Sequence, residues 1–198
     1  MDSHKFAVKL FVQDPSRVDV HEFVPIFHGW IQRAAVPDHL LIDVSDYAHV
    51  HHGPGTLLVA HEANFYTDQG EGRLGLMYQR KQPAEGTFVD RLRQAFVATL
   101  EGAQRLEKDP ALSGRIKFRT EEVLVSIHDR LKAPSTPETF EAVRGDLQQF
   151  FNDAYGGDVA LRHVGTDETV FKVEVKMTGS PSVHALLERL AGASAGRT

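Results

Sequence analysis

The sequence predicts an α+β fold made of two successive βαββα units. Alternating apolar residues mark the strands, and apolar residues at helical spacing mark helices between them. The order of these elements then repeats in the second half of the chain, except that the first half has one extra strand. We expect mostly antiparallel sheets with helices on one face, a first unit over residues 1–112, a second over 113–190, and a flexible tail over 191–198.

Strands are expected over most of the first half, separated by two helices. One helix carries Val20, Phe23 and Phe27 and must accommodate Pro25, so it either begins near that proline or is kinked there. The other begins after Thr87, which is a favourable N-cap residue. The strands are expected over residues 5–12, 39–47, 56–66 and 73–81.

The hairpin between the strands 39–47 and 56–66 contains Gly53-Pro54-Gly55, a strong turn sequence. If Gly53-Pro54 is the centre of this hairpin, Asp46 and His61 lie opposite each other. We expect such a pair to fix the register of the two strands.

The second half repeats the order of strand, Pro-Ser turn, helix, hairpin and helix. Thr136-Pro137 is a strong helix start and Gly156-Gly157 a helix end. Strands are expected over residues 116–129, 158–164 and 169–177, and a short helix after Ser180-Pro181. This order resembles the ferredoxin-like split βαβ unit, used twice. The resemblance lies in element order only, and it implies that the helices leave one sheet face free.

Composition restricts the classes of function. The chain has 198 residues, of which 41% are hydrophobic and 25% charged, and it has a formal net charge of −5. An acidic balance disfavours a dedicated nucleic-acid binder. The sequence lacks an apolar run of the roughly 18–20 residues that a membrane span needs, and its N-terminal residues lack a secretory pattern. With no cysteine, disulfides and thiolate chemistry are excluded. We expect a soluble cytoplasmic protein that binds neither membrane nor nucleic acid.

The free sheet face is the candidate binding surface. Alternation predicts that one face of the first unit collects aromatic and ionisable side chains. Such a face can line a pocket, form a wet surface or make a homodimer interface, and the outward residues Tyr47, Tyr66 and Met77 favour a homodimer. The face is expected to carry Lys9, Asp43, Ser45, Tyr47, His49, His51, Glu62, Asn64, Tyr66, Arg73 and Gln79, and the candidate binding residues among these are Asp43, Tyr47, Glu62, Asn64, Tyr66 and Arg73.

Two histidines form a candidate metal site. His49 and His51 are two residues apart, so on a strand their imidazoles project to the same side. A carboxylate from Glu62 or Asp43 would complete a nitrogen and oxygen ligand set, so a divalent metal is a candidate cofactor. The alternative is a polar hairpin tip with solvated histidines. The surrounding residues do not complete any of the His-x-His hydrolase, cupin or zincin motifs.

Three functions stay open. The favoured one is a non-enzymatic protein that binds a ligand, another protein or itself through the open sheet face. The second is a small-molecule enzyme centred on His49, His51 and Glu62. The third is a fused form of the dimeric α/β-barrel arrangement, which would enclose a ligand such as haem.

Overall fold

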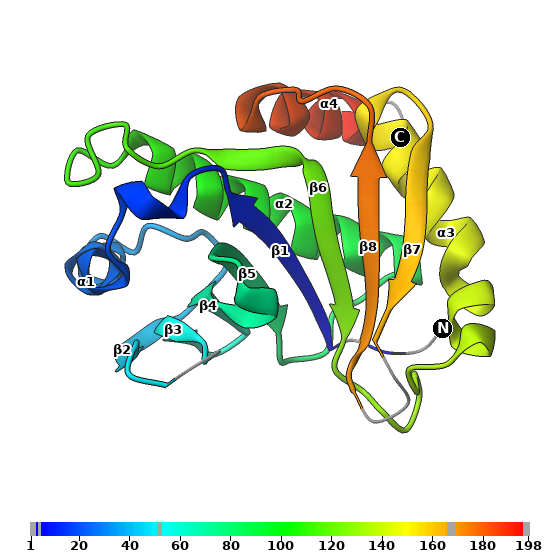
Figure 1. Ribbon diagram of the computed structural model, residues 1–198, viewed down its shortest axis with the longest axis horizontal. Coiled ribbons are helices and arrows are strands. Elements are labelled where there is room, and N and C mark those ends of the chain that lie inside the picture. Colours follow the sequence, from blue (N-terminus) through cyan, green and yellow to red (C-terminus); the bar gives the residue numbers. More distant parts are fainter. Residues whose placement is uncertain (1–2, 4, 51–52, 166–168, 196–198) are drawn as a thin grey trace.

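The protein contains one continuous antiparallel sheet of eight strands, in the order β2-β3-β4-β5-β1-β6-β8-β7 (Figure 1). The computed structural model describes residues 3, 5–50, 53–165 and 169–195. The strands are β1 (Phe6–Val12), β2 (Leu41–Tyr47), β3 (Gly55–Ala60), β4 (Ala63–Asp68), β5 (Gly75–Arg80), β6 (Phe118–Ile127), β7 (Val159–Val164) and β8 (Phe171–Met177).

The described helices lie on one face of the sheet and share a single apolar core with it. Helices α1, α2 and α3 contact the sheet directly, and α4 packs against α2 and α3. Their bounds are α1 (Phe23–Gln32), α2 (Phe88–Lys108), α3 (Pro137–Tyr155) and α4 (Val183–Ala195). The predicted α+β class with helices on one face is therefore confirmed. No helix in the described part of the chain is both long and apolar enough to cross a bilayer.

Local capping signals set the helix boundaries as the sequence predicts. Thr87 and Asp90 form a reciprocal capping box at the start of α2. Thr136 caps α3, whose first residue is Pro137, and Gly156 ends α3 in the left-handed conformation. Pro25 lies in the first turn of α1, where a missing N–H costs no helical hydrogen bond.

The expected strand over residues 56–66 is wrong, because this segment forms two strands, β3 and β4. They are joined by a tight turn at His61 and Glu62. The turn shifts the alternation, so Leu58 faces the helices on β3 while Phe65 does so on β4. Leu57 therefore lies on the face away from the helices, whereas one unbroken strand over 56–66 would place it on the same side as Phe65.

The register of β2 and β3 also differs from the expectation. Asp46 lies opposite Thr56, and Tyr47 lies opposite Gly55, so the turn is centred before Gly53. His61 instead donates its backbone N–H to the carbonyl of Leu40. The Asp46 carboxylate instead pairs with His21, whose Nδ1 lies 3.1 Å from Asp46 Oδ2. The expected Asp46–His61 pair therefore does not form.

Both halves of the chain contribute to one sheet and one core. β1 pairs with β5 on one side and with β6 on the other. Leu112 and Ile116, near the expected joint of the two units, are fully buried. Helix α4 continues through Ala195, into the segment expected to be a tail. A duplication of two ferredoxin-like units stays a prediction.

Candidate functional site

The sheet face opposite the helices is called here the open face. It carries four of the predicted binding residues: Asp43 and Tyr47 on β2, and Asn64 and Tyr66 on β4. They do not form one cluster, because β3 separates β2 from β4. The amide oxygen Oδ1 of Asn64 is buried and has no hydrogen-bond partner among the described residues.

The other predicted site residues lie outside this arrangement. Glu62 is in the turn between β3 and β4, and its Oε2 accepts the N–H of Leu40, just before β2, at 2.8 Å. His49 follows the other end of β2 and stacks on Tyr47 with 6.4 Å between ring centroids. Glu62 therefore lies at the start of β2 and His49 after its end. Because β2 spans about 20 Å, the two side chains are not close to each other. His51 lies outside the described residues, and the predicted metal pair stays a prediction.

Much of the open face is already covered within the chain. Ala7, Tyr66 and Met77 form a small second apolar cluster there, with Leu57 packed against it. Burial raises the pKa of the Tyr66 phenol, and the nearby charge of Asp68 raises it further. Tyr66 and Met77 are therefore much less available to a partner than the sequence predicts.

The connection from β4 to β5 folds over the open face and is tied down by Lys9. The Lys9 side chain is 0% exposed although it points to this face from the central strand β1. Its Nζ donates to Asp68 Oδ2 at 2.5 Å, to the carbonyl of Gly70 at 2.9 Å and to Glu71 Oε2 at 3.3 Å. A buried ammonium needs such a full set of acceptors, because burying a charge without partners is very costly.

Three further charged residues link this connection to the second half of the sheet. Arg73 donates to both carboxylate oxygens of Glu122 on β6, at 2.6 and 2.7 Å, and its guanidinium lies 3.6 Å from the ring centroid of Phe11. Lys172 on β8 donates to Glu71 Oε1 at 2.5 Å. We call Lys9, Asp68, Glu71, Arg73, Glu122 and Lys172 the charged clamp.

The clamp shifts the titration of its carboxylates. The hydrogen bonds from Arg73 lower the pKa of Glu122 to about 2 despite its burial. Burial alone would raise the pKa of Glu71, but the hydrogen bond from Lys172 and the charge of Lys9 lower it overall. Both carboxylates are therefore ionised at neutral pH, so the clamp consists of paired charges, which suits holding a segment in place rather than transferring protons.

A serine and a histidine pair at the end of β6, near the clamp. Ser126 Oγ and His128 Nε2 are 3.0 Å apart. Burial lowers the pKa of His128 to about 4, and the charge of Lys172 lowers it as well. The pairing resembles a nucleophile with its base, but Ser126 is 1% exposed, so a substrate cannot reach its hydroxyl. We assign the pair a structural role.

The neutral, partly buried His128 predicts acid sensitivity. In the unfolded chain a histidine has a pKa of about 6.5, so between pH 6.5 and about 4 the unfolded state binds a proton that the folded state does not. The free energy of unfolding should therefore decrease as the pH falls through this window, by at most about 3 kcal/mol. Chemical denaturation across this pH range should show a clearly smaller decrease in His128→Gln.

Lys172→Met should give a pH dependence of stability between those of the wild type and His128→Gln. Removing the Lys172 charge removes one of the causes that lower the His128 pKa, while burial stays. The decrease in stability on acidification should then be reduced but not abolished. A His128→Gln variant with the same pH dependence as the wild type would contradict the assignment.

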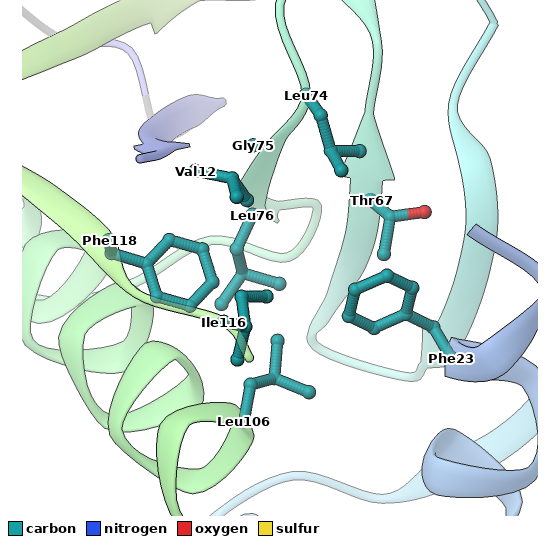
Figure 2. A pocket seen from close by; sticks show the side chains of 9 residues that line it. All are labelled: Val12, Phe23, Thr67, Leu74, Gly75, Leu76, Leu106, Ile116 and Phe118. Carbon is teal, nitrogen blue, oxygen red and sulfur yellow. The ribbon is translucent and has the colours of Figure 1, made fainter. Parts of the chain in front are cut away.

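The internal cavity in Figure 2 has no features of a binding site. It lies where β1, β5 and β6 approach α1 and α2, and Thr67 supplies its one polar side chain. It is too narrow to admit a water molecule. A wider groove of about 570 Å³ runs between α2 and α4, with apolar side chains such as Leu187 and Leu190 beside surface charges of α2. Two of those charges, Glu101 and Arg105, pair with each other at 3.5 Å.

The exposed apolar side chains are concentrated at the edge strand β2. Five large hydrophobic residues are exposed in the described part of the chain: two lie in β2, one directly precedes it, one lies in the turn that follows it, and the fifth is elsewhere. Leu40 is 65% exposed and Ile42 is 55% exposed, and the fifth residue, Leu131, lies far away in the sequence, after β6. We call Leu40, Ile42, Tyr47 and Val50 the β2 edge surface.

Sequence reasoning identified Tyr47 but missed the other members of this surface. By alternation Ile42 falls on the apolar side of its strand and so reads as a core residue, because alternation cannot show which strand lies at the edge of a sheet. The clamp was missed for a similar reason: Lys9 was placed on the correct face, but its acceptors lie about 60 residues away in sequence.

Comparison of this chain with protein-family models, with curated proteins and with solved structures finds no match. Function is therefore inferred from the residues and geometry of the site itself.

Proposed function

We propose that this protein is a non-enzymatic binding or assembly protein whose contact surface is the β2 edge surface. One observation carries the proposal: of the five exposed large hydrophobic residues in the described part of the chain, four lie in this single edge strand or flank it. The four side chains are spread along the roughly 20 Å length of one edge strand, and exposed apolar side chains that follow one edge favour an interaction site more than single scattered ones do.

An edge strand adds a second means of binding. Half of its backbone N–H and C=O groups point away from the sheet and can pair with a strand from another chain. The opposite edge strand, β7, carries the charged Arg162 and contributes none of the exposed large hydrophobic residues found in the described chain. Charge does not distinguish the two edges, because β2 carries Asp43 and Asp46, so the difference lies in the exposed apolar side chains. The two edges thus differ in a way that favours β2 as the contact.

The charged clamp supports the same proposal. Because Lys9 and Arg73 tie the β4–β5 connection across the open face, the centre of that face is filled by the chain itself. This leaves the β2 side, with Asp43 and Tyr47, as the accessible part of the face that the sequence predicts to bind a ligand or partner. The continuous sheet also disfavours a ligand enclosed between two facing sheets.

Site-specific photo-crosslinking tests this proposal. A photoreactive residue is introduced in place of Ile42 in one variant and in place of Leu131, which is 97% exposed, in a matched control. Both are irradiated as purified protein and in an extract of the cells that make the protein. We expect discrete adducts from position 42 and none from position 131. Adducts from both positions alike, or from neither, would contradict the proposal.

We also propose that the two halves of the chain are related units. In the first half, β1 pairs with the last strand, β5, which pairs with the preceding strand, β4. In the second half, β6 pairs with the last strand, β8, which pairs with the preceding strand, β7. The matching order supports two ferredoxin-like units joined antiparallel through β1 and β6.

A further inference from the structure

We infer that the occupant of the β2 edge surface is a second copy of this chain, paired antiparallel through residues 43–47 about a two-fold axis at Ser45. The inference rests on the proposed function and names its partner. It follows from the direction of the backbone groups of β2, from the limits of its regular segment, and from the charges that the pairing brings together.

The direction of the backbone groups follows from Thr56. Its N–H donates to Thr67 Oγ1 on β4 at 2.8 Å, so Thr56 faces β4 and not Asp46, its neighbour on β2. Asp46 and Thr56 are therefore a non-hydrogen-bonded pair, and the N–H and C=O of Asp46 point away from the sheet. Because the direction alternates along a strand, those of Val44 also point outward, and those of Ser45 point to β3.

The regular part of the edge is short and centred on Ser45. A bulge between Leu41 and Asp43 adds Ile42 as an extra residue on β2, which interrupts the ladder there. After Tyr47 the chain turns, with the N–H of Val50 donating to the carbonyl of Tyr47 at 2.9 Å. The uninterrupted segment is thus 43–47, and its outward-pointing residues, Val44 and Asp46, are placed symmetrically about Ser45.

A two-fold axis at Ser45 pairs these outward groups with each other. Val44 of each copy then lies opposite Asp46 of the other, and each such pair exchanges two backbone hydrogen bonds. The two Ser45 residues face each other as a non-hydrogen-bonded pair. Beyond the ladder, the exposed Leu40 and Ile42 of one copy lie toward the end that carries Val50 of the other, which covers apolar surface at both ends.

The charges fit this register. Asp43 of one copy lies opposite Tyr47 of the other, whose hydroxyl can donate to the carboxylate and whose ring carries the stacked His49. The carboxylate of Asp46 is already paired with His21 at 3.1 Å within its own chain. Neither aspartate meets a carboxylate, although each edge carries two acidic residues. A register centred between Val44 and Ser45 would place Asp43 opposite Asp46 and is disfavoured.

The absence of cysteine from the sequence permits a direct test. In the inferred dimer the two Ser45 Cα atoms are about 4.5 Å apart, which suits a disulfide. Under mild oxidation, Ser45→Cys should therefore become a covalent dimer of twice the chain mass. Asp43→Cys, which lies opposite Tyr47, should crosslink far less, and Leu131→Cys not at all. Equal crosslinking of all three variants, or none with Ser45→Cys, would overturn the inference.

Sedimentation of the unmodified protein and of Ile42→Lys completes the test. The wild type should form a dimer, and Ile42→Lys should weaken it about 100-fold, because the two-fold axis brings two lysines into the interface. Leu131→Lys should leave the dimer unchanged. A monomeric wild type that still gives photo-crosslinked adducts with other proteins at position 42 would overturn the second copy as partner and leave the proposed function standing.

Discussion

Replacing Lys9 with methionine is expected to lower the free energy of unfolding by about 3 kcal/mol. Methionine matches the length of the lysine stem but leaves the carboxylates of Asp68 and Glu71 without the ammonium that they share. Removing one partner of a buried ion pair costs about 3–5 kcal/mol. The lower end applies here, because both carboxylates are partly open to solvent. Urea denaturation at neutral pH measures the difference.

Lys172→Met is the matched control for this prediction. It removes a lysine from the same clamp, and the same partner Glu71 loses a hydrogen bond. Because Lys172 is partly exposed, water can replace it, and the expected loss is below about 1 kcal/mol. If Lys9→Met were as stable as Lys172→Met, the Lys9 contacts would not be what holds the β4–β5 connection over the sheet.

The second large effect is expected at Gly75, which lies on β5 between Lys9 and its acceptor Asp68. A Cβ atom at this position would lie 2.5 Å from the carbonyl oxygen of Leu10 and 2.7 Å from Cε of Lys9. The first contact is with the backbone of the neighbouring strand, which cannot move without disturbing the ladder. Gly75→Ala should therefore destabilise the protein by about 2–3 kcal/mol, measured by thermal or urea denaturation.

Gly145→Ala provides the comparison. Gly145 lies within α3, and a Cβ there would meet nothing within 4 Å. Alanine favours a helix over glycine by about 1 kcal/mol, so this variant should be at least as stable as the wild type. A Gly75→Ala variant with wild-type stability would show that the Lys9 side chain does not need to cross β5 at this position.

Local sequence signals predicted the helix boundaries well, because capping depends on neighbouring residues. Thr87, Thr136 with Pro137, and Gly156 each act within one helical turn, and each has the predicted role. Alternation likewise placed Lys9 on the face of β1 that points away from the helices, as the structure has it. Both signals are local, so the rest of the chain does not alter them.

Local sequence patterns do not show the order of the strands in the sheet, and features that depend on this order were not predicted. The turn at His61 and Glu62 contains no glycine or proline, so the segment 56–66 reads as one strand and the face of β3 is inverted. The position of β2 at the sheet edge is equally hidden. Consequently Tyr66 and Met77 were predicted at the contact surface but are buried, whereas Leu40 and Ile42 are exposed at it.

The clamp and the β2 edge have complementary roles in this account. The clamp joins the first half of the sheet to the second through Arg73 with Glu122 and Glu71 with Lys172, and it closes the centre of the open face. The β2 edge surface stays uncovered within the chain. Variants of Lys9 or Gly75 should therefore change stability, while Ile42→Lys should change association with little change in stability.

Residue-resolved amide hydrogen exchange tests the central claim, that β2 is the contact edge, most directly. The exchange of β2 amides is followed by NMR at protein concentrations below and above the association midpoint. The amides of Val44 and Asp46, which point away from β3, should become protected only at the higher concentration, while Ser45, which points to β3, should change little. Fast exchange of Val44 and Asp46 at every concentration, in a protein that nonetheless associates, would contradict the account.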